Sequence, residues 1–146
     1  MQGLLKYGFL CLSFLISSGS CWGEELELEF LRDSSTQQSL TDVQSLSINW
    51  QQTAYNKANF GFTSDALWLR VPLNNPSSSK IVKHLRINYP LLDHVDAYLT
   101  HEGETLEHKY LSDRIPYNES RQQEKYYLFT YTLAPATKYQ VYIQVK

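Results

Sequence analysis

Between residues 66 and 73, aliphatic positions alternate one by one with aromatic, charged or proline positions. The aliphatic positions are Leu67, Leu69, Val71 and Leu73, and those between them are Trp68, Arg70 and Pro72. A period of two is typical of a β-strand whose two sides meet different environments. We therefore expect a strand with one packed side and one side that a ligand can reach.

The rest of the chain repeats this organisation in short segments. Strands are predicted over residues 26–31, 66–73, 82–89, 94–101, 104–111, 125–133 and 138–145. Turn residues separate them at 74–79, 101–104 and 134–137, and one helical turn fits residues 39–47, with Ser39 or Thr41 as its cap. Many short strands without interleaved helices predict an all-β fold, an antiparallel β-sandwich or jelly roll.

In each predicted strand, every second position is apolar and the positions between them are polar or aromatic. The inward set is Leu67, Leu69, Val71, Leu85, Ile87, Val95, Ala97, Leu99, Tyr127, Phe129, Tyr131, Val141, Ile143 and Val145. The opposite set is Trp68, Arg70, His84, Arg86, Asn88, Asp96, Tyr98, Gln140, Tyr142 and Gln144. If those strands share a sheet, the second set forms a surface with rings beside planar hydrogen-bonding groups.

Such a surface suits a carbohydrate or a small carboxylate, because rings stack on sugar faces while guanidinium and amide groups orient hydroxyl or carboxylate groups. The predicted ligand-binding residues are Trp68, Arg70, Arg86, Asn88, Asp96, Tyr98 and Tyr142. A structural alternative stays open. A loop would then cover Trp68, and Arg70 would pair with Asp93 or Asp96 merely to hold the sheet edge.

The N-terminus has the pattern of a secretory signal peptide. Lys6 precedes an apolar run over residues 8–16 and then small residues, which predicts a leader over residues 1–23 with cleavage near Ser20 to Gly23. The run is shorter than the roughly 20 residues that a membrane span needs. Lipidation of Cys21 is an alternative, but Ser18 stands where an aliphatic residue is usual.

Composition narrows the partners and the type of stabilisation. Both cysteines, Cys11 and Cys21, lie in or beside the leader, so the mature domain over residues 24–146 has no disulfide framework. Removing Lys6 with the leader leaves 12 basic against 15 acidic residues. Without a basic patch, nucleic acid is not expected as a partner.

Three ordered motifs resemble a known family. They are G-F-T-S-D-A-L-W-L-R-V-P-L-N-N-P at 61–76, I-N-Y-P-L-L-D-H-V-D-A-Y-L at 87–99 and S-D-R-I-P-Y at 112–117. Together they resemble the periplasmic sensor domain of seven-transmembrane receptors with diverse intracellular signalling modules. The third motif departs from the family's Gly-Asp-Arg-Pro-Phe pattern, with Ser112 in place of Gly and Ile115 between Arg114 and Pro116.

The resemblance implies a jelly roll similar to carbohydrate-binding modules, on the periplasmic side of the inner membrane. It also implies a receptor with its own transmembrane and cytoplasmic signalling domains, the output being, for example, a diguanylate cyclase or a histidine kinase. The chain ends on Val145 and Lys146, directly out of a strand pattern. We therefore expect it to be an N-terminal part of a longer receptor, and the family's last strand to be missing.

Catalysis and cofactors are not expected. Nothing resembles a nucleophile elbow, and no nucleotide loop is present. His101, Glu102, Glu104, Glu107 and His108 fall on both faces of a predicted hairpin, which does not favour a metal site. We predict that this segment has no enzymatic activity, no cofactor and no metal.

Two hypotheses about function follow. In the first, a carbohydrate or carboxylate binds the face around Trp68 and Arg70 and biases a receptor between two states. In the second, the same face or an edge strand docks a periplasmic protein or a second copy of the receptor, as a homodimer, without a small-molecule ligand.

Overall fold

The computed structural model describes residues 27–45, 47–54, 60, 63–87, 94–112 and 127–146. Eight strands and one short helix make up this part of the chain. In chain order they are β1 (Glu27–Asp33), α1 (Leu40–Val43), β2 (Gln51–Ala54), β3 (Ala66–Asn75), β4 (Ile81–Ile87), β5 (His94–His101), β6 (Glu104–Ser112), β7 (Tyr127–Leu133) and β8 (Thr137–Val145). The predicted all-β class is confirmed.

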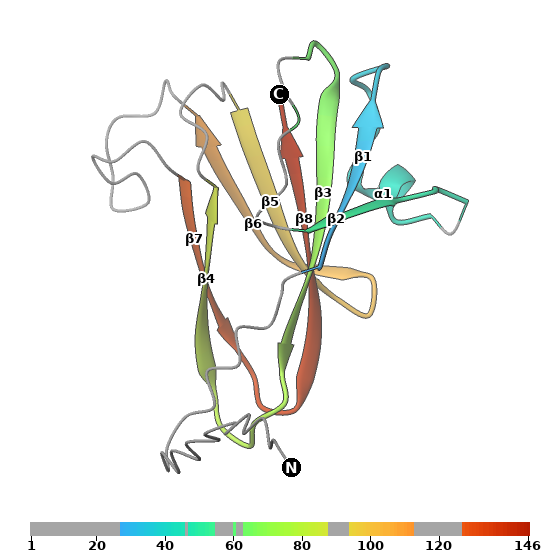
Figure 1. Ribbon diagram of the computed structural model, residues 1–146. Coiled ribbons are helices and arrows are strands. Elements are labelled where there is room, and N and C mark those ends of the chain that lie inside the picture. The colour runs from blue at the N-terminus through green and yellow to red at the C-terminus, as the bar shows by residue number, and fades with distance from the viewer. Residues whose placement is uncertain (1–26, 46, 55–59, 61–62, 88–93, 113–126) are drawn as a thin grey trace, which may run out of the picture.

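Six of the strands form one antiparallel sheet in the order β2-β1-β3-β8-β5-β6, and β4 and β7 form a separate antiparallel pair. The pair stands against one side of the larger sheet (Figure 1). The predicted antiparallel sandwich is therefore confirmed, whereas the jelly-roll connectivity stays a prediction.

The main core lies between the two sheets and consists of the inward parity of the strands. Its buried members include Leu67, Leu69, Val71, Leu85, Val95, Ala97, Leu99, Tyr127, Phe129, Tyr131, Val141, Ile143 and Val145. Ile87 packs against them and is partly buried. The predicted inward set is thus confirmed, because the burial of aliphatic side chains imposes a period of two on each strand.

Local sequence accounts for the turns between strands. Glu102 and Gly103 both have positive φ, at 51° and 86°, which is the geometry of a tight hairpin turn between β5 and β6. At the end of β3, the buried side chain of Asn75 donates to the carbonyls of Ser79, Leu133 and Ala134. Asn75 therefore joins the β3–β4 turn to the end of β7. Each predicted turn cluster contains an observed turn, but residues 74 and 75 belong to β3 and residue 137 begins β8.

The side of the six-stranded sheet that faces away from β4 and β7 is called the outer face below. Residues 34–45 and 47–50, called the strap, lie over part of it and include α1 (Figure 1). Ser39 caps α1 in a capping box with Asp42, so the predicted helical turn and its cap are confirmed. Val43 of α1 is 0% exposed and packs with Trp68 and Tyr142 in a second hydrophobic cluster.

The observed strands differ from the expected ones in number and in extent. Strand β2 was not predicted from the sequence, and β1 and β3 each run two residues further than expected. None of the described helices has the length and apolar character needed to cross a bilayer. The predicted leader, Cys11, Cys21 and residues 113–117 lie outside the described residues.

Candidate ligand-binding face

Five of the predicted site residues lie together on the outer face. Trp68 and Arg70 are on β3, Asp96 and Tyr98 on β5, and Tyr142 on β8 between them. Tyr142 is directly opposite Arg70 of β3 on one side and Tyr98 of β5 on the other. In the same way, Gln144 of β8 is opposite Trp68 and Asp96. Directly opposed residues in a sheet share a face, so these five side chains form one surface.

The other two predicted residues do not join this surface. Arg86 is on β4, where it faces Leu128 of β7, so its strand belongs to the other sheet. It is exposed, and its neighbour Leu85 points into the core. The outward polar positions of all strands were expected to lie on one sheet, and this expectation is wrong for β4. Alternation reveals which way a side chain points but not which strand lies beside it. Asn88 lies outside the described residues.

The strap covers the aromatic part of the outer face. Trp68 is 1% exposed and Tyr142 is 7% exposed beneath Val43. Leu40 and Trp50 of the strap also pack against this cluster. The arrangement of Trp68 matches the structural alternative, in which a loop covers the indole.

Arg70 is the charged centre of the exposed remainder. Its Nε donates to Glu29 Oε2 at 2.5 Å, and its guanidinium carbon lies 4.6 Å from the centre of the Trp50 ring. The side chains of Arg70 and Glu29 are 26% and 22% exposed, so solvent still reaches both. Burial alone would lower the pKa of Arg70, but the bond and charge of Glu29, together with Tyr142, raise it above its ordinary value.

The sequence reading missed Glu29 and Trp50. Glu29 faces Arg70 across the β1–β3 pair, and Trp50 comes from the end of the strap. The alternation of Leu28, Glu29 and Phe30 signals a polar position on a strand, but only the observed pairing identifies its partner. The structural alternative named Asp93 or Asp96 for this role; Asp96 is engaged elsewhere, and Asp93 lies outside the described residues.

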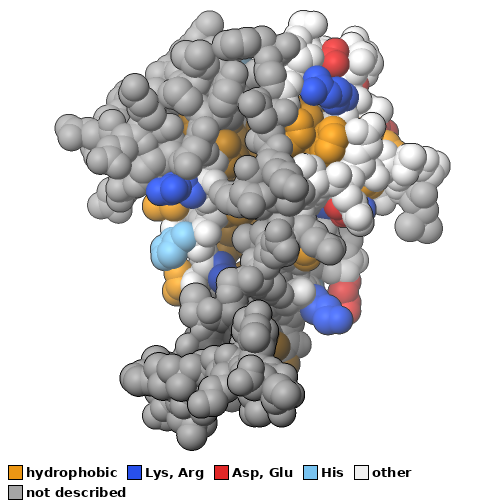
Figure 2. Space-filling model, viewed as in Figure 1, with side chains coloured by type: hydrophobic (Ala, Val, Ile, Leu, Met, Phe, Trp, Pro, Cys, Tyr) orange, Lys and Arg blue, Asp and Glu red, His pale blue; other side chains and the backbone are white. Residues whose placement is uncertain are grey.

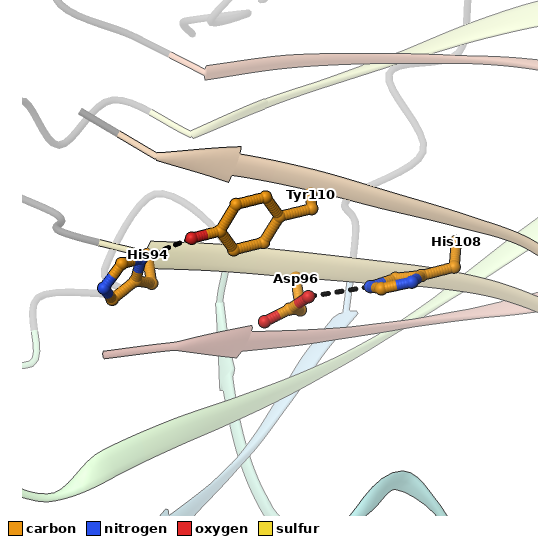
Figure 3. A network of polar contacts seen from close by, with 4 residues as sticks. All are labelled: His94, Asp96, His108 and Tyr110. Atoms are coloured by element: carbon orange, nitrogen blue, oxygen red, sulfur yellow. Dashed lines mark hydrogen bonds and ion pairs between the residues drawn. The ribbon is translucent and has the colours of Figure 1, made fainter. Parts of the chain in front are cut away.

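Next to this centre, β5 and β6 carry a row of polar contacts (Figure 3). His108 Nε2 lies 2.7 Å from Asp96 Oδ1, and the Tyr110 hydroxyl lies 2.7 Å from His94 Nδ1. The rings of Tyr98 and His108 stack at 4.3 Å with an interplanar angle of 4°. Burial, and then the charge of Asp96, raise the pKa of Tyr98.

These stacks decide what the aromatic rings can offer to a ligand. Tyr98 stacks against His108, and Trp68 stacks against Tyr98 at 6.3 Å. The guanidinium of Arg70 lies over the face of Trp50. The ring faces are thus occupied by protein groups, whereas sugar recognition by stacking needs a ring face open to solvent.

Three polar atoms near the strap have no hydrogen-bond partner in the part of the chain that the structure describes. They are the indole nitrogens of Trp50 and Trp68 and the amide oxygen of Gln38, all of them buried. A buried polar atom without a partner costs about 1–3 kcal/mol. The covered part of the outer face therefore has two hydrogen-bond donors and one acceptor still to be satisfied.

The two histidines considered as metal ligands, His101 and His108, form other contacts. His101 Nδ1 lies 2.8 Å from the carbonyl oxygen of Lys138, and His108 contacts Asp96. Within the described ranges, no group of three or more His, Cys, Asp or Glu side chains is placed to hold a metal ion. Among the described side chains visible in Figure 2, the charged ones lie scattered between other residues and do not gather into a basic patch.

Fold and face together define an all-β domain that presents a polar and aromatic surface from one side of a sandwich. The chain belongs to the family 7TMR-DISM extracellular 2, whose model matches residues 25–146. The resemblance seen in the three motifs is therefore confirmed. No curated protein matches the chain.

Family membership fixes the broad role of the domain. It is the extracellular sensory domain of a membrane receptor that has intracellular modules, and it lies on the periplasmic side. Membership also points to a segment that senses rather than catalyses.

Proposed function

We propose that this domain binds a small carboxylate on its outer face, with Arg70 as the anchor, and passes occupancy to a cytoplasmic output domain. A diguanylate cyclase or a histidine kinase would serve as that output. The observation that carries the proposal is the partly exposed guanidinium of Arg70, held in place between Glu29 and Trp50.

The donor count of Arg70 supports an anionic ligand. A guanidinium has five N–H donors; Glu29 takes the one on Nε and Tyr142 also bonds the group, so donors remain on the terminal nitrogens. The terminal nitrogens match the two oxygens of a carboxylate in a bidentate pair. A fixed and partly desolvated guanidinium also loses little side-chain entropy on binding.

A carboxylate fits this surface better than a neutral sugar. The faces of Trp50 and Tyr98 are already covered by Arg70 and His108, and Trp68 is buried. The indole N–H groups of Trp50 and Trp68 have no hydrogen-bond partner among the described residues and are buried, so a ligand oxygen would accept from them only if the strap moved away.

The strap gives the proposal a route to signalling. It packs on Trp68 and Tyr142 through Val43, and it reaches Arg70 through Trp50. A ligand that binds Arg70 beside Trp50 would change the packing of the strap. Any ligand that prefers one arrangement of the strap shifts its population.

A thermal-shift titration tests the proposal with succinate and citrate as acid probes and with glucose and galactose as neutral probes. We expect the acids to raise the melting temperature saturably and the sugars to leave it unchanged, because a ligand of the folded state stabilises that state. Arg70→Gln should abolish the shift, and Arg86→Gln, an exposed arginine of the other sheet, should retain it. A shift with sugars alone, or equal shifts in both variants, would contradict the proposal.

A further inference from the structure

We propose that β6 pairs with β6 of a second copy of this chain, about a two-fold axis at His108. The proposal concerns the edge of the sheet and is independent of the ligand at Arg70. In the described part of the chain, β6 is the outermost strand of the six-stranded sheet at this side. An edge strand offers outward-pointing N–H and C=O groups to another strand.

The hydrophobic residues of β6 point to a protein partner. Leu106 and Tyr110 are 55% and 45% exposed, and they are two of the three exposed large hydrophobic residues found among the described residues. Both are on β6, two positions on either side of His108. Such a symmetric spacing is what a self-complementary strand requires, since pairing about His108 sets Leu106 against Tyr110 of the second copy.

The charges of β6 have the same symmetry. Glu107 and Lys109 flank His108 and form an ion pair of 3.2 Å within one copy. Antiparallel pairing about His108 adds, beside each of these pairs, the opposite charges of the second copy, with Glu107 opposite Lys109. An axis at Glu107 would instead oppose two glutamates, and an axis at Lys109 would oppose two lysines. Shifting the axis by one residue to Glu107 or Lys109 would also keep the outer faces of the two copies on the same side of the joined sheet. Charge complementarity therefore favours the axis at His108 over these two.

The usual protection of an edge strand is weak here. Lysine side chains commonly guard an edge, but the ammonium group of Lys109 bonds the carbonyl of Thr130 and lies over the ring of Tyr131. A bulge leaves Leu106 without an opposite residue on β5, because Glu107 faces Leu99 and Thr105 faces Thr100. Residues 107–112 keep a continuous register with β5 beyond this bulge. Pairing about His108 is therefore regular over residues 107–109, and next to them it sets the bulged Leu106 against Tyr110.

One strand pair buries little surface, so we expect a weak dimer in solution. Two receptor copies anchored in one membrane meet at a much higher effective concentration. Pairing there would join two six-stranded sheets into one, with the outer faces continuous across the axis.

Charge-reversal variants test the register by sedimentation equilibrium. Glu107→Lys alone and Lys109→Glu alone each replace two attractive pairs across the axis by two repulsive ones, and each also removes the ion pair within its own copy. We expect each to raise the dimer dissociation constant about tenfold. An equimolar mixture of the two variants should associate as well as the unaltered protein, because opposite charges then face each other again. Circular dichroism checks that both variants are folded.

A cysteine on the axis gives a second test, which does not depend on Lys109. In a Cys11→Ser, Cys21→Ser background, His108→Cys faces its own copy and should form disulfide-linked dimers several-fold faster than Val82→Cys, an exposed control on β4. Equal linking rates would overturn the proposal. So would an unaltered protein that stays monomeric at the highest concentration, or a mixture that associates no better than either variant alone.

Discussion

The guanidinium of Arg70 lies over the ring of Trp50, with 4.6 Å between its central carbon and the ring centre. Arg70 belongs to the sheet, whereas Trp50 is the last residue of the strap before β2. A contact between a sheet residue and a covering segment makes the position of the strap sensitive to anything that binds Arg70. A cation over an indole contributes about 0.5–2 kcal/mol, depending on how far it is desolvated.

Replacing Glu29 should strengthen acid binding. Glu29→Gln removes the negative charge next to Arg70 and keeps a side chain of similar shape. Because partly exposed ion pairs contribute about 1 kcal/mol or less, we expect succinate affinity to rise by up to about fivefold in calorimetric titrations. The exposed residue Glu104 provides a matched Glu→Gln control, which should leave the affinity as it was.

Shortening Val43 should loosen the strap. Its side chain is 0% exposed against Trp68 and Tyr142, so Val43→Ala should destabilise this contact by about 1.5–3 kcal/mol. Hydrogen exchange should increase in α1 and change little in β5. Thr41→Ala, at an exposed position of the same helix, is the control, and equal exchange in the two variants would argue against a packed strap.

Removing the Asn75 side chain should destabilise the end of the sandwich. Its amide donates to three carbonyls, and its oxygen accepts from the backbone N–H and the hydroxyl of Ser77. Asn75→Ala leaves buried groups unpaired, and we expect the free energy of unfolding to fall by about 2–3 kcal/mol in urea titrations. The neighbouring variant Asn74→Ala is exposed and should cost much less.

Asp33 should make stability depend on pH in the acid range. Burial alone would raise its pKa, but hydrogen bonds from Ser35 and Gln38 outweigh burial and hold the pKa below the ordinary 3.8. A carboxylate with a depressed pKa stabilises the fold above its unfolded pKa, and this contribution is lost as pH falls through the folded pKa. Asp33→Asn should therefore be less stable than the unaltered protein at pH 6, with the difference shrinking towards pH 3. A difference that stays constant over this range would contradict this role.

The sequence predicted the direction of side chains better than it predicted neighbours. The inward positions of β3, β5 and β8 follow from aliphatic residues at every second place. Arg86 was misplaced relative to Trp68 because pairing between strands depends on contacts far apart in the chain. Strand β2 was missed because Gln-Gln-Thr-Ala carries no alternating apolar residues, and its pairing with β1 defines it.

On the candidate face, too, the direction of side chains could be predicted, whereas their neighbours could not. The outward direction of Arg70, Tyr98 and Tyr142 could be predicted from alternation, but only the pairing of β8 with β3 and β5 places the three side chains on one surface. A loop over Trp68 was the structural alternative left open by the sequence, but the segment that covers it could not be predicted. A helix of four residues gives little sequence signal, and its docking depends on Val43 meeting a particular part of the sheet.

The most direct test of the account is a nitrogen-15 NMR titration of the indole N–H signals with succinate. Signals of Trp50 and Trp68 can be assigned with Trp→Phe variants. Both nitrogens are buried near the proposed anchor and have no hydrogen-bond partner within the described part of the chain. We predict that the Trp50 signal shifts saturably in the unaltered protein and in Arg86→Gln, and that it stays fixed in Arg70→Gln. An unmoved Trp50 signal, or the same titration curve in Arg70→Gln, would contradict a carboxylate site at Arg70.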